Sequence, residues 1–254
     1  MIERIKKQSP ARIIALGFAL VILVGSLLLM LPCSIQDGVT VRYIDALYTS
    51  TSAVCVTGLI AIDAGDTFTP LGQFFLAMLI QVGGLGVTAV GAGIIVAMGR
   101  RVNLKGRVLI REAMNVDSGR GLVKFVKDIF LVTVIFELCG ALLSFLVFVQ
   151  DYPPLRAAGI SLFHSVAAFN NSGFDILGNF QNLIPYRHNV LLNLTTCGLI
   201  FFGGIGFLVI REMWVKRLNW HKLSMHAKVV LSVSGCLIAV GTILIKLTED
   251  VTWL

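Results

Sequence analysis

The sequence predicts an all-α integral membrane protein, built from tandem units of a helix, a short re-entrant helix and a second helix. Three observations lead to this fold class. The 254 residues are 56% hydrophobic and 14% charged, with a mean hydropathy of +0.87, which is too apolar for a soluble domain. Apolar stretches of about 20 residues recur along the chain. The polar segments between them repeat.

The apolar stretches define the spans. A helix of about 20 residues crosses a hydrocarbon core about 30 Å thick. We expect five such spans, at residues 11–31, 70–98, 128–149, 188–210 and 229–247. Residues 4–33 partly match a secretory signal, but the apolar run is too long and Pro32 interrupts the cleavage pattern. We therefore interpret this segment as the first span.

The basic residues define the orientation. Most of the 21 lysines and arginines precede the first span or fill the second and fourth loops, within residues 4–12, 100–127 and 211–228. By the positive-inside rule these segments are cytoplasmic, and so is the N-terminus. The net charge of +7 is thus a topology signal and does not indicate a nucleic-acid-binding surface. The protein is expected to be embedded in the membrane by several spans.

An internal repeat organises the chain. With Gly58 over Gly173, the run ALYTSTSAVCVTGL (46–59) aligns with SLFHSVAAFNNSGF (161–174), and LIQVGGLGV (79–87) parallels LIFFGGIGF (199–207). We expect a first repeat at 1–99, a cytoplasmic basic linker at 100–127, a second repeat at 128–210, a linker at 211–228, and the first helix of an incomplete third repeat at 229–254.

The middle segments of the two repeats, 44–54 and 155–169, are too short to cross a bilayer. Non-helical backbone at membrane depth is tolerated only when it is buried in protein or lines water. A helix entering from outside directs the negative end of its dipole at the membrane centre, which favours a cation. The residues that follow, Cys55, Val56, Thr57 and Gly58, are expected to return outward in an extended conformation. Their carbonyls could then replace a cation's hydration shell.

A glycine is needed where this strand turns, because a Cβ would penalise the required φ values. Gly58 and Gly173 occupy that position. The alternative is that each is a turn glycine in an ordinary extracellular loop. The recurrence of helix, polar residues and glycine favours the first interpretation.

The runs SAVCVTGL, HSVAAFNNSGF, QVGGLG and GGIGF resemble the Trk/Ktr/HKT superfamily of potassium transporters, most closely its KtrB-type membrane subunits. The likeness covers nearly the whole chain. It implies a potassium-channel-like fold with four helix, pore-loop, helix repeats. It also implies that Cys55, Val56, Thr57 and Gly58 form the first filter strand, and Asn170, Asn171, Ser172 and Gly173 the second. Glycine at 58, where some relatives have serine, favours potassium over sodium.

The resemblance further implies potassium uptake through a filter of backbone carbonyls, across a bacterial cell membrane. It implies no enzymatic activity and no cofactor besides the transported potassium, with sodium as a candidate modulator. The expected partners are a second copy, as a homodimer, and a cytosolic RCK-type nucleotide-binding regulatory subunit. No nucleic-acid partner is expected.

One departure from the family pattern is large, since the chain supplies two filter strands where a closed ring needs four. Either the sequence is truncated or several copies complete the ring; the resemblance favours truncation. Two other functions stay open. One is an ion-coupled secondary carrier, and the other is a non-conducting fragment.

Several single residues carry narrower expectations. The outer acids either concentrate cations or are solvated, with Asp175 favoured for a cation funnel; they are Asp45, Asp63, Asp66, Asp151 and Asp175. Glu137, in mid-span, is expected to make a structural hydrogen bond between helices. The glycines at 83, 84, 86, 203, 204 and 206 are expected to allow either close helix approach or a bend, with packing favoured over a moving hinge. The five scattered cysteines are expected to be buried packing residues.

Overall fold

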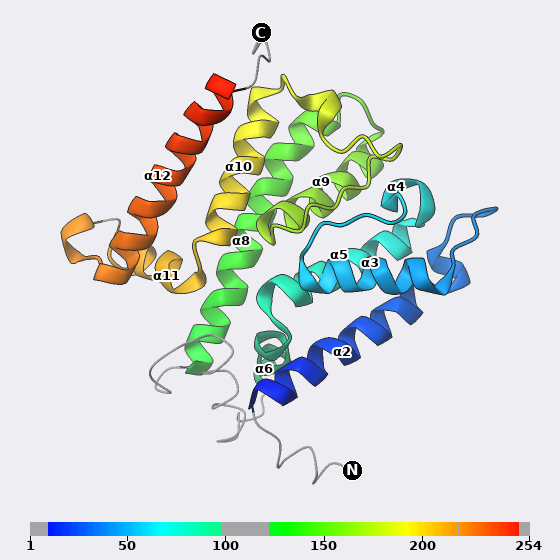
Figure 1. The fold of residues 1–254 in the computed structure, drawn as a ribbon, viewed down its shortest axis with the longest axis horizontal. Coiled ribbons are helices and arrows are strands. Elements are labelled where there is room, and N and C mark those ends of the chain that lie inside the picture. Colours follow the sequence, from blue (N-terminus) through cyan, green and yellow to red (C-terminus); the bar gives the residue numbers. More distant parts are fainter. Residues whose placement is uncertain (1–9, 98–121, 218, 249–254) are drawn as a thin grey trace. The chain divides into compact units, whose positions relative to one another are not determined.

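We describe the protein from a computed structural model that covers residues 10–97, 122–217 and 219–248 (Figure 1). These residues form helices and connecting loops, and their only β-type pairing is an isolated bridge between Ile35 and Phe68. The all-helical prediction is therefore confirmed. Most of the predicted basic linker at 100–127 lies outside the described residues. The chain divides into two compact units after Ile200, and each is described by itself.

The first unit begins with a group of helices that we call the first copy. Its elements are α2 (Pro10–Leu29), η1 (Pro32–Ser34), α3 (Tyr43–Cys55), α4 (Ala64–Thr67), α5 (Pro70–Leu85) and α6 (Val87–Ala97). Helix α3 packs against both α2 and α5 (Figure 1). Helix α5 begins where Thr69 accepts a hydrogen bond from the Gly72 N–H and Pro70 provides the first turn.

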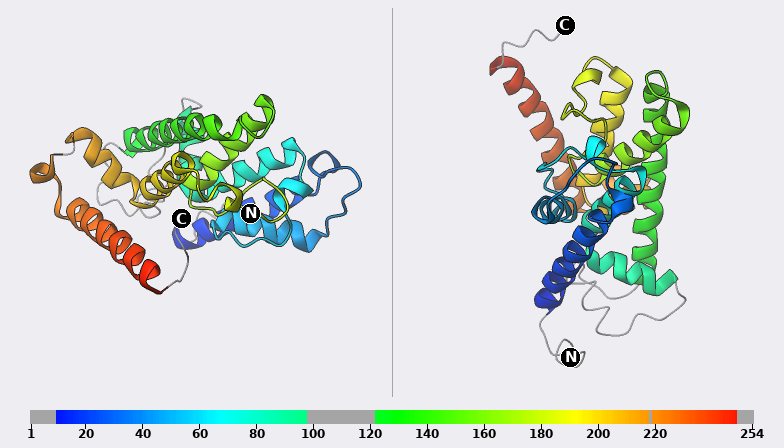
Figure 2. Two further views of the ribbon diagram at one scale, coloured as in Figure 1. Left: turned by 90° about the horizontal axis from the view of Figure 1, so that it is seen from above. Right: turned by 90° about the vertical axis from the view of Figure 1, so that its right-hand side faces the viewer.

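The second copy follows in the same order. It contains α8 (Leu122–Phe148), α9 (Pro154–Phe169), η2 (Ile184–Tyr186) and α10 (Val190–Gly204), the last of which crosses the boundary between the units. Helix α9 packs along α8, a long and nearly straight helix (Figure 2), and also contacts α5 of the first copy. Helix α5 therefore lies against the short helices of both copies. The second unit continues with α11 (Phe207–Val215), η3 (Trp220–Lys222) and α12 (Met225–Thr248).

Three of the described helices are long and apolar enough to cross a membrane: α2, α8 and α12. Helices α10 and α11 qualify together as one broken span, and α5 is a shorter apolar helix. Within the two spans expected at 70–98 and 188–210, the helix is interrupted in the structure. The helices stop at Gly86 and Gly206, whose φ values of 84° and 87° cannot continue a right-handed helix.

The core of the first unit draws on both copies. Large side chains that are almost fully buried come from α2, α5 and the loop before it, and from α8, α9 and α10; they are Leu29, Phe68, Leu76, Ile80, Phe148, Phe169 and Leu192. Large apolar side chains on the outer faces of α2 and α8 are exposed, for example Leu20, Leu27, Leu131 and Leu142. Exposed leucines of this kind are typical of helices that face lipid rather than water.

Candidate functional site

The short helices α3 and α9 end in the same way. The turn after each helix contains a residue with left-handed backbone, Val56 with φ 54° and Asn171 with φ 57°. Each turn is closed by a six-residue hydrogen bond, Thr57 N to Ser52 O (3.0 Å) and Ser172 N to Ala167 O (2.9 Å). This is the Schellman pattern, which ends a helix and reverses the chain.

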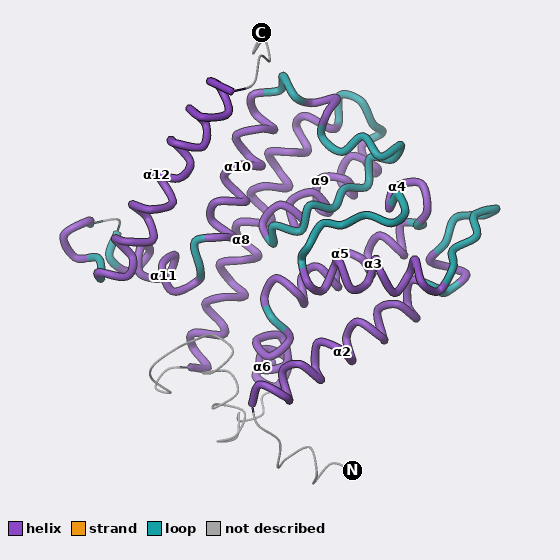
Figure 3. The backbone as a smooth tube through the Cα atoms, viewed as in Figure 1, coloured by secondary structure: helices purple, strands orange, loops and turns teal. Residues whose placement is uncertain are grey.

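After the turns, two non-helical strands lie side by side (Figure 3). Gly58 has φ 71° and Gly173 has φ 73°. A Cβ added at Gly58 would lie 2.8 Å from the Ser172 carbonyl oxygen and 3.3 Å from the Gly173 Cα. A Cβ at Gly173 would lie 3.2 Å from the Gly58 Cα. Only glycine fits at both positions, because the φ is positive and the two backbones are in contact.

The predicted filter residues do not all share one conformation. Cys55 is the last residue of α3, Val56 is in the turn, and Asn170 caps α9. The expectation that Cys55 and Val56 would be extended was therefore wrong, since the helix and its cap continue through them. Non-helical strand begins at Thr57 and at Ser172. Thr57 and Gly173 are exposed in the structure, so the strand pair has an open side.

Each short helix is fixed to the long helix of its own copy by a serine. Ser50 Oγ donates to the Ile22 carbonyl (2.8 Å), and Ser165 Oγ donates to the Glu137 carbonyl (2.6 Å). A glycine beside each serine leaves room for it; a Cβ at Gly25 or Gly140 would lie 2.6 or 2.5 Å from the serine Oγ. Sequence reasoning aligned the two serines but missed this role. The two glycines, spaced like the serines, were the available signal.

The second strand has a polar support that the first lacks. Asn170 Nδ2 donates to Gln81 Oε1 of α5 (3.0 Å) and to Glu137 Oε1 of α8 (3.3 Å). The expected structural hydrogen bond of Glu137 between helices is confirmed. Gly83 packs against the Val54 backbone and Gly84 against the Asn170 side chain, so the packing prediction is confirmed for these two glycines.

The carboxyl groups of the outer acids mostly take part in ion pairs or hydrogen bonds within the protein. Asp45 pairs with Arg42 (2.9 Å), and Asp151 accepts a hydrogen bond from the Tyr186 hydroxyl (2.8 Å). Asp63 and Asp66 accept backbone hydrogen bonds, so these two are not merely solvated loop acids.

Asp175 lies two residues beyond Gly173 and accepts a hydrogen bond from the Leu177 N–H (3.0 Å). Burial raises the pKa of the Asp175 carboxyl, the Leu177 hydrogen bond opposes this, and the nearby charges of Asp63 and Asp66 raise the pKa further.

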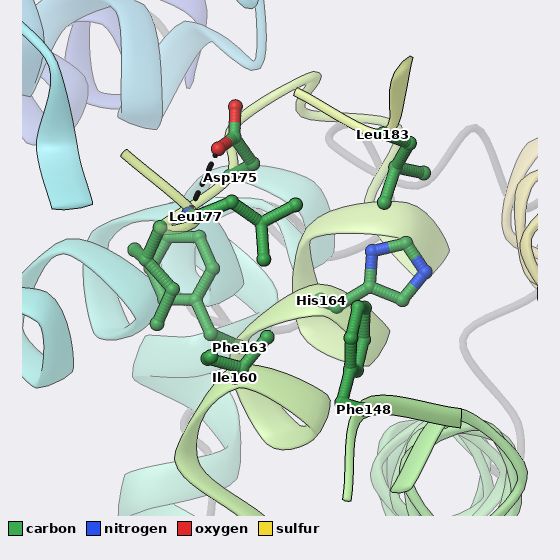
Figure 4. Close-up of a pocket in the computed structure, with 8 residues that line it drawn as sticks. Phe148, Ile160, Phe163, His164, Asp175, Leu177 and Leu183 are labelled. Carbon is green, nitrogen blue, oxygen red and sulfur yellow. Dashed lines mark hydrogen bonds between the residues drawn. The ribbon is translucent and has the colours of Figure 1, made fainter. Parts of the chain in front are cut away.

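Behind α9, a cavity of about 10 Å³ lies between His164, Asp175 and apolar side chains (Figure 4). His164 Nε2 lies 2.9 Å from Thr196 Oγ1, whose own proton goes to the Leu192 carbonyl (2.8 Å), so the imidazole is the donor. The Phe148 ring packs at 80° to the imidazole. A cavity of this size holds at most about one water molecule. We therefore interpret this cavity as a small packing gap beside α9 and not as a binding site.

No group of three His, Cys, Asp or Glu side chains within the described ranges is arranged to hold a metal ion. All five cysteines are free and exposed, so the expectation of buried packing cysteines was wrong. The local geometry at the two strands therefore offers backbone groups rather than a side-chain metal site.

Together, the apolar helices and the two short helices that reverse into glycine strands define a multi-pass membrane protein of the transporter class. The family model described as the TrkH cation transport protein matches residues 10–251, and the chain belongs to this family. The sequence resemblance to Trk/Ktr-type potassium transporters is thereby confirmed.

Similar proteins with assigned names support the same family. The potassium/sodium uptake protein NtpJ of Enterococcus hirae is 36% identical over 253 residues, covering 98% of this chain and 55% of the relative. The Ktr system potassium uptake protein B of Bacillus subtilis is 36% identical over 95% of this chain and 53% of its own length. Its namesake from Vibrio alginolyticus is 35% identical over 96% and 53%. The chain thus spans about half the length of these relatives.

Proposed function

We propose that this chain takes part in potassium uptake across the bacterial cell membrane. Potassium passes, down its electrochemical gradient, through a filter of backbone carbonyls. The filter residues are those predicted from the sequence, Cys55, Val56, Thr57 and Gly58 together with Asn170, Asn171, Ser172 and Gly173. The observation that carries the proposal is the contact of two glycine strands, each following a short helix with the same C-terminal turn.

The physical reason lies in the groups that these strands present. Carbonyl oxygens in a row can replace the hydration shell of a cation as it enters. The C-terminal ends of α3 and α9 precede the strands and carry partial negative charge, which favours a cation there. The positive φ of Gly58 and Gly173 allows carbonyl directions that other residues would not adopt without strain.

In the proposed topology α3 and α9 are the two re-entrant pore helices. The five spans are α2, the broken pair α5 and α6, α8, the broken pair α10 and α11, and α12. The N-terminus is cytoplasmic. The repeats keep the bounds predicted from the sequence, with 1–99 and 128–210 as complete units and 229–254 as the start of a third.

The chain provides two filter strands of the four that a closed ring requires. The other two come from further residues of a longer protein or from other copies of this chain. We retain from the family resemblance a homodimer and a cytosolic RCK-type nucleotide-binding subunit as proposed partners. Three relatives named as potassium uptake proteins support potassium as the transported ion.

The test is growth and uptake in cells that lack their own potassium uptake systems. This chain and the longest reading frame that contains it are each expressed, as wild type and as Gly58→Ser. We expect the longer form to restore growth at limiting potassium, with the ratio of potassium to sodium uptake lowered by Gly58→Ser. An unchanged ratio in Gly58→Ser would refute the filter, and full rescue by these 254 residues alone would show that the missing strands come from other copies of this chain and not from a longer protein.

A second candidate is sodium-coupled carriage of potassium. Two observations favour it, the helix breaks at Gly86 and Gly206, and the printed name of NtpJ, which includes sodium. Broken helices hold ions in many secondary carriers. Potassium uptake that saturates and requires a stoichiometric sodium flux would support the carrier, whereas uptake of potassium without a fixed sodium flux would support the filter.

A further inference from the structure

Two carboxylates join the loops that follow the glycine strands. Asp63 Oδ1 accepts from the N–H groups of Gly65 (2.8 Å) and Asp66 (2.9 Å) and so caps α4. Asp63 Oδ2 accepts from the Phe180 N–H in the other loop (2.6 Å). Asp66 Oδ2 accepts from the neighbouring Asn179 N–H (2.7 Å). We call these two cross-loop hydrogen bonds the carboxylate clamp.

The backbone that the clamp holds is strained. Asn179 and Phe180 have φ values of 58° and 52°, and a bulky residue such as phenylalanine rarely adopts this conformation. The Phe180 side chain is 64% exposed, so its own packing does not enforce the turn. Such a conformation persists only where the surroundings fix it. Here the fixing contacts are two short hydrogen bonds from the backbone to carboxyl oxygens, of 2.7 Å at Asn179 and 2.6 Å at Phe180.

The loops also meet through their backbones at this point. A Cβ added at Gly65 would lie 2.7 Å from both the Gly178 nitrogen and the Ile176 carbonyl oxygen. The two loops therefore touch twice, first at Gly58 and Gly173 and again a few residues later at Gly65 and Gly178. The clamp closes the second contact, so it limits how far the two glycine strands can separate.

We propose that Asp63 and Asp66 are positioning residues that set the spacing of the two filter strands through the carboxylate clamp. This inference rests on the proposed function. Asp63 is 8% exposed, and both its oxygens accept hydrogen bonds, so it acts through the backbone and not by attracting ions from solution.

The two aspartates respond differently to the same substitution. In Asp63→Asn the single carbonyl oxygen can serve either the α4 cap or Phe180, and the NH₂ group then faces a second N–H. In Asp66→Asn the amide can turn its oxygen to Asn179 and keep the clamp. With the longest reading frame, we expect Asp63→Asn to lower the potassium-to-sodium uptake ratio on the order of tenfold, with Asp66→Asn close to wild type.

Two further variants separate spacing from charge. Asp37→Asn removes the same charge from an exposed loop residue, and we expect it to leave the ratio unchanged. Gly65→Ala changes no charge but pushes the loops apart, and we expect it to lower the ratio as Asp63→Asn does. If Asp63→Asn does not accumulate in the membrane, Asp63→Ser replaces it, because serine keeps the α4 cap and is too short to reach Phe180.

Hydrogen exchange of the purified protein provides a readout independent of transport. We expect slow exchange in the peptide containing Asn179 and Phe180, faster exchange in Asp63→Asn, and no change in Asp66→Asn. Equally fast exchange in wild type and Asp63→Asn would overturn the clamp, as would an uptake ratio lowered equally by Asp37→Asn. An unchanged ratio in Gly58→Ser would refute the filter instead, while the exchange result would still decide whether the clamp exists.

Discussion

The two copies share their framework and differ beside their strands. In both, a serine fixes the short helix to the long helix, and a Schellman turn leads into a glycine strand. In the first copy the Thr57 hydroxyl donates to Ser52 Oγ (3.0 Å). In the second, Asn170 reaches Gln81 and Glu137. The two copies therefore reverse the chain in the same way, but different side-chain hydrogen bonds support the strand that follows in each copy.

The largest effect is expected from substitutions at Gly58 and Gly173, the glycines that both copies have in their strands. Gly58→Ala and Gly173→Ala each place a Cβ against the other strand and force alanine into a positive φ. We expect potassium uptake to fall at least about tenfold, and further than in a glycine without such a contact, because the Cβ displaces the opposing strand in addition to the left-handed cost of roughly 1–2 kcal/mol. Gly38→Ala is the matched control, because its φ is 83° but nothing lies within 4 Å. Equal losses in all three variants would show that the strand contact is irrelevant.

The next largest effect is expected when Asn170 and Cys55, which occupy equivalent positions in the two copies, are exchanged. Asn170→Cys gives the second copy the residue of the first and leaves Gln81 and Glu137 without the amide that they share. We expect a loss of about 1–3 kcal/mol in stability, measured as a lower thermal midpoint of the purified protein. The reciprocal Cys55→Asn changes an exposed residue and should leave the midpoint near wild type. A midpoint unaffected by Asn170→Cys would contradict the support role.

A smaller effect is expected at the turns. Val56 and Asn171 occupy equivalent left-handed positions, but asparagine tolerates this conformation far better than a β-branched residue. Val56→Asn should therefore raise the free energy of unfolding by about 1 kcal/mol, and Asn171→Val should lower it by a similar amount. Thermal unfolding of both variants measures the difference. Changes of the same sign would mean that side-chain packing, not backbone strain, decides stability there.

The smallest expected effect concerns Asp175, which only the second copy has at this place. Because its pKa is raised, chiefly by burial, the carboxyl takes up a proton at a higher pH than an ordinary aspartate. If it attracts cations, uptake at limiting potassium should fall as the external pH is lowered, starting at a higher pH than an ordinary aspartate would give, and Asp175→Asn should flatten this dependence. An unaltered pH profile in Asp175→Asn would exclude the funnel.

Much of the arrangement was predictable because the relevant signals are local. The apolar runs predicted the long helices, and the alignment of Gly58 with Gly173 predicted that both segments belong to equivalent strands. The positions of the breaks at Gly86 and Gly206 stayed undecided, since a glycine in an apolar run is compatible with a bend or with close packing, as Gly83 and Gly84 show. The pattern of apolar residues does not distinguish a helix break from close packing at a glycine.

The cross-loop bonds of Asp63 and Asp66 could not be predicted for a different reason. Their partners are backbone N–H groups 113 and 117 residues away, and a backbone donor leaves no mark in the sequence. The exposure of the cysteines was misjudged because free cysteine is usually buried, and such a general tendency does not decide the position of a particular residue.

The serine attachments have a consequence for biogenesis. Ser50 and Ser165 each find an acceptor on the preceding long helix of the same copy, not on the other copy. Each nascent hairpin can therefore shield its hydroxyl as soon as it leaves the insertion machinery, before its sister has been synthesised. The shared core and the contact of the glycine strands, by contrast, require both copies and can form only when the second has been inserted beside the first.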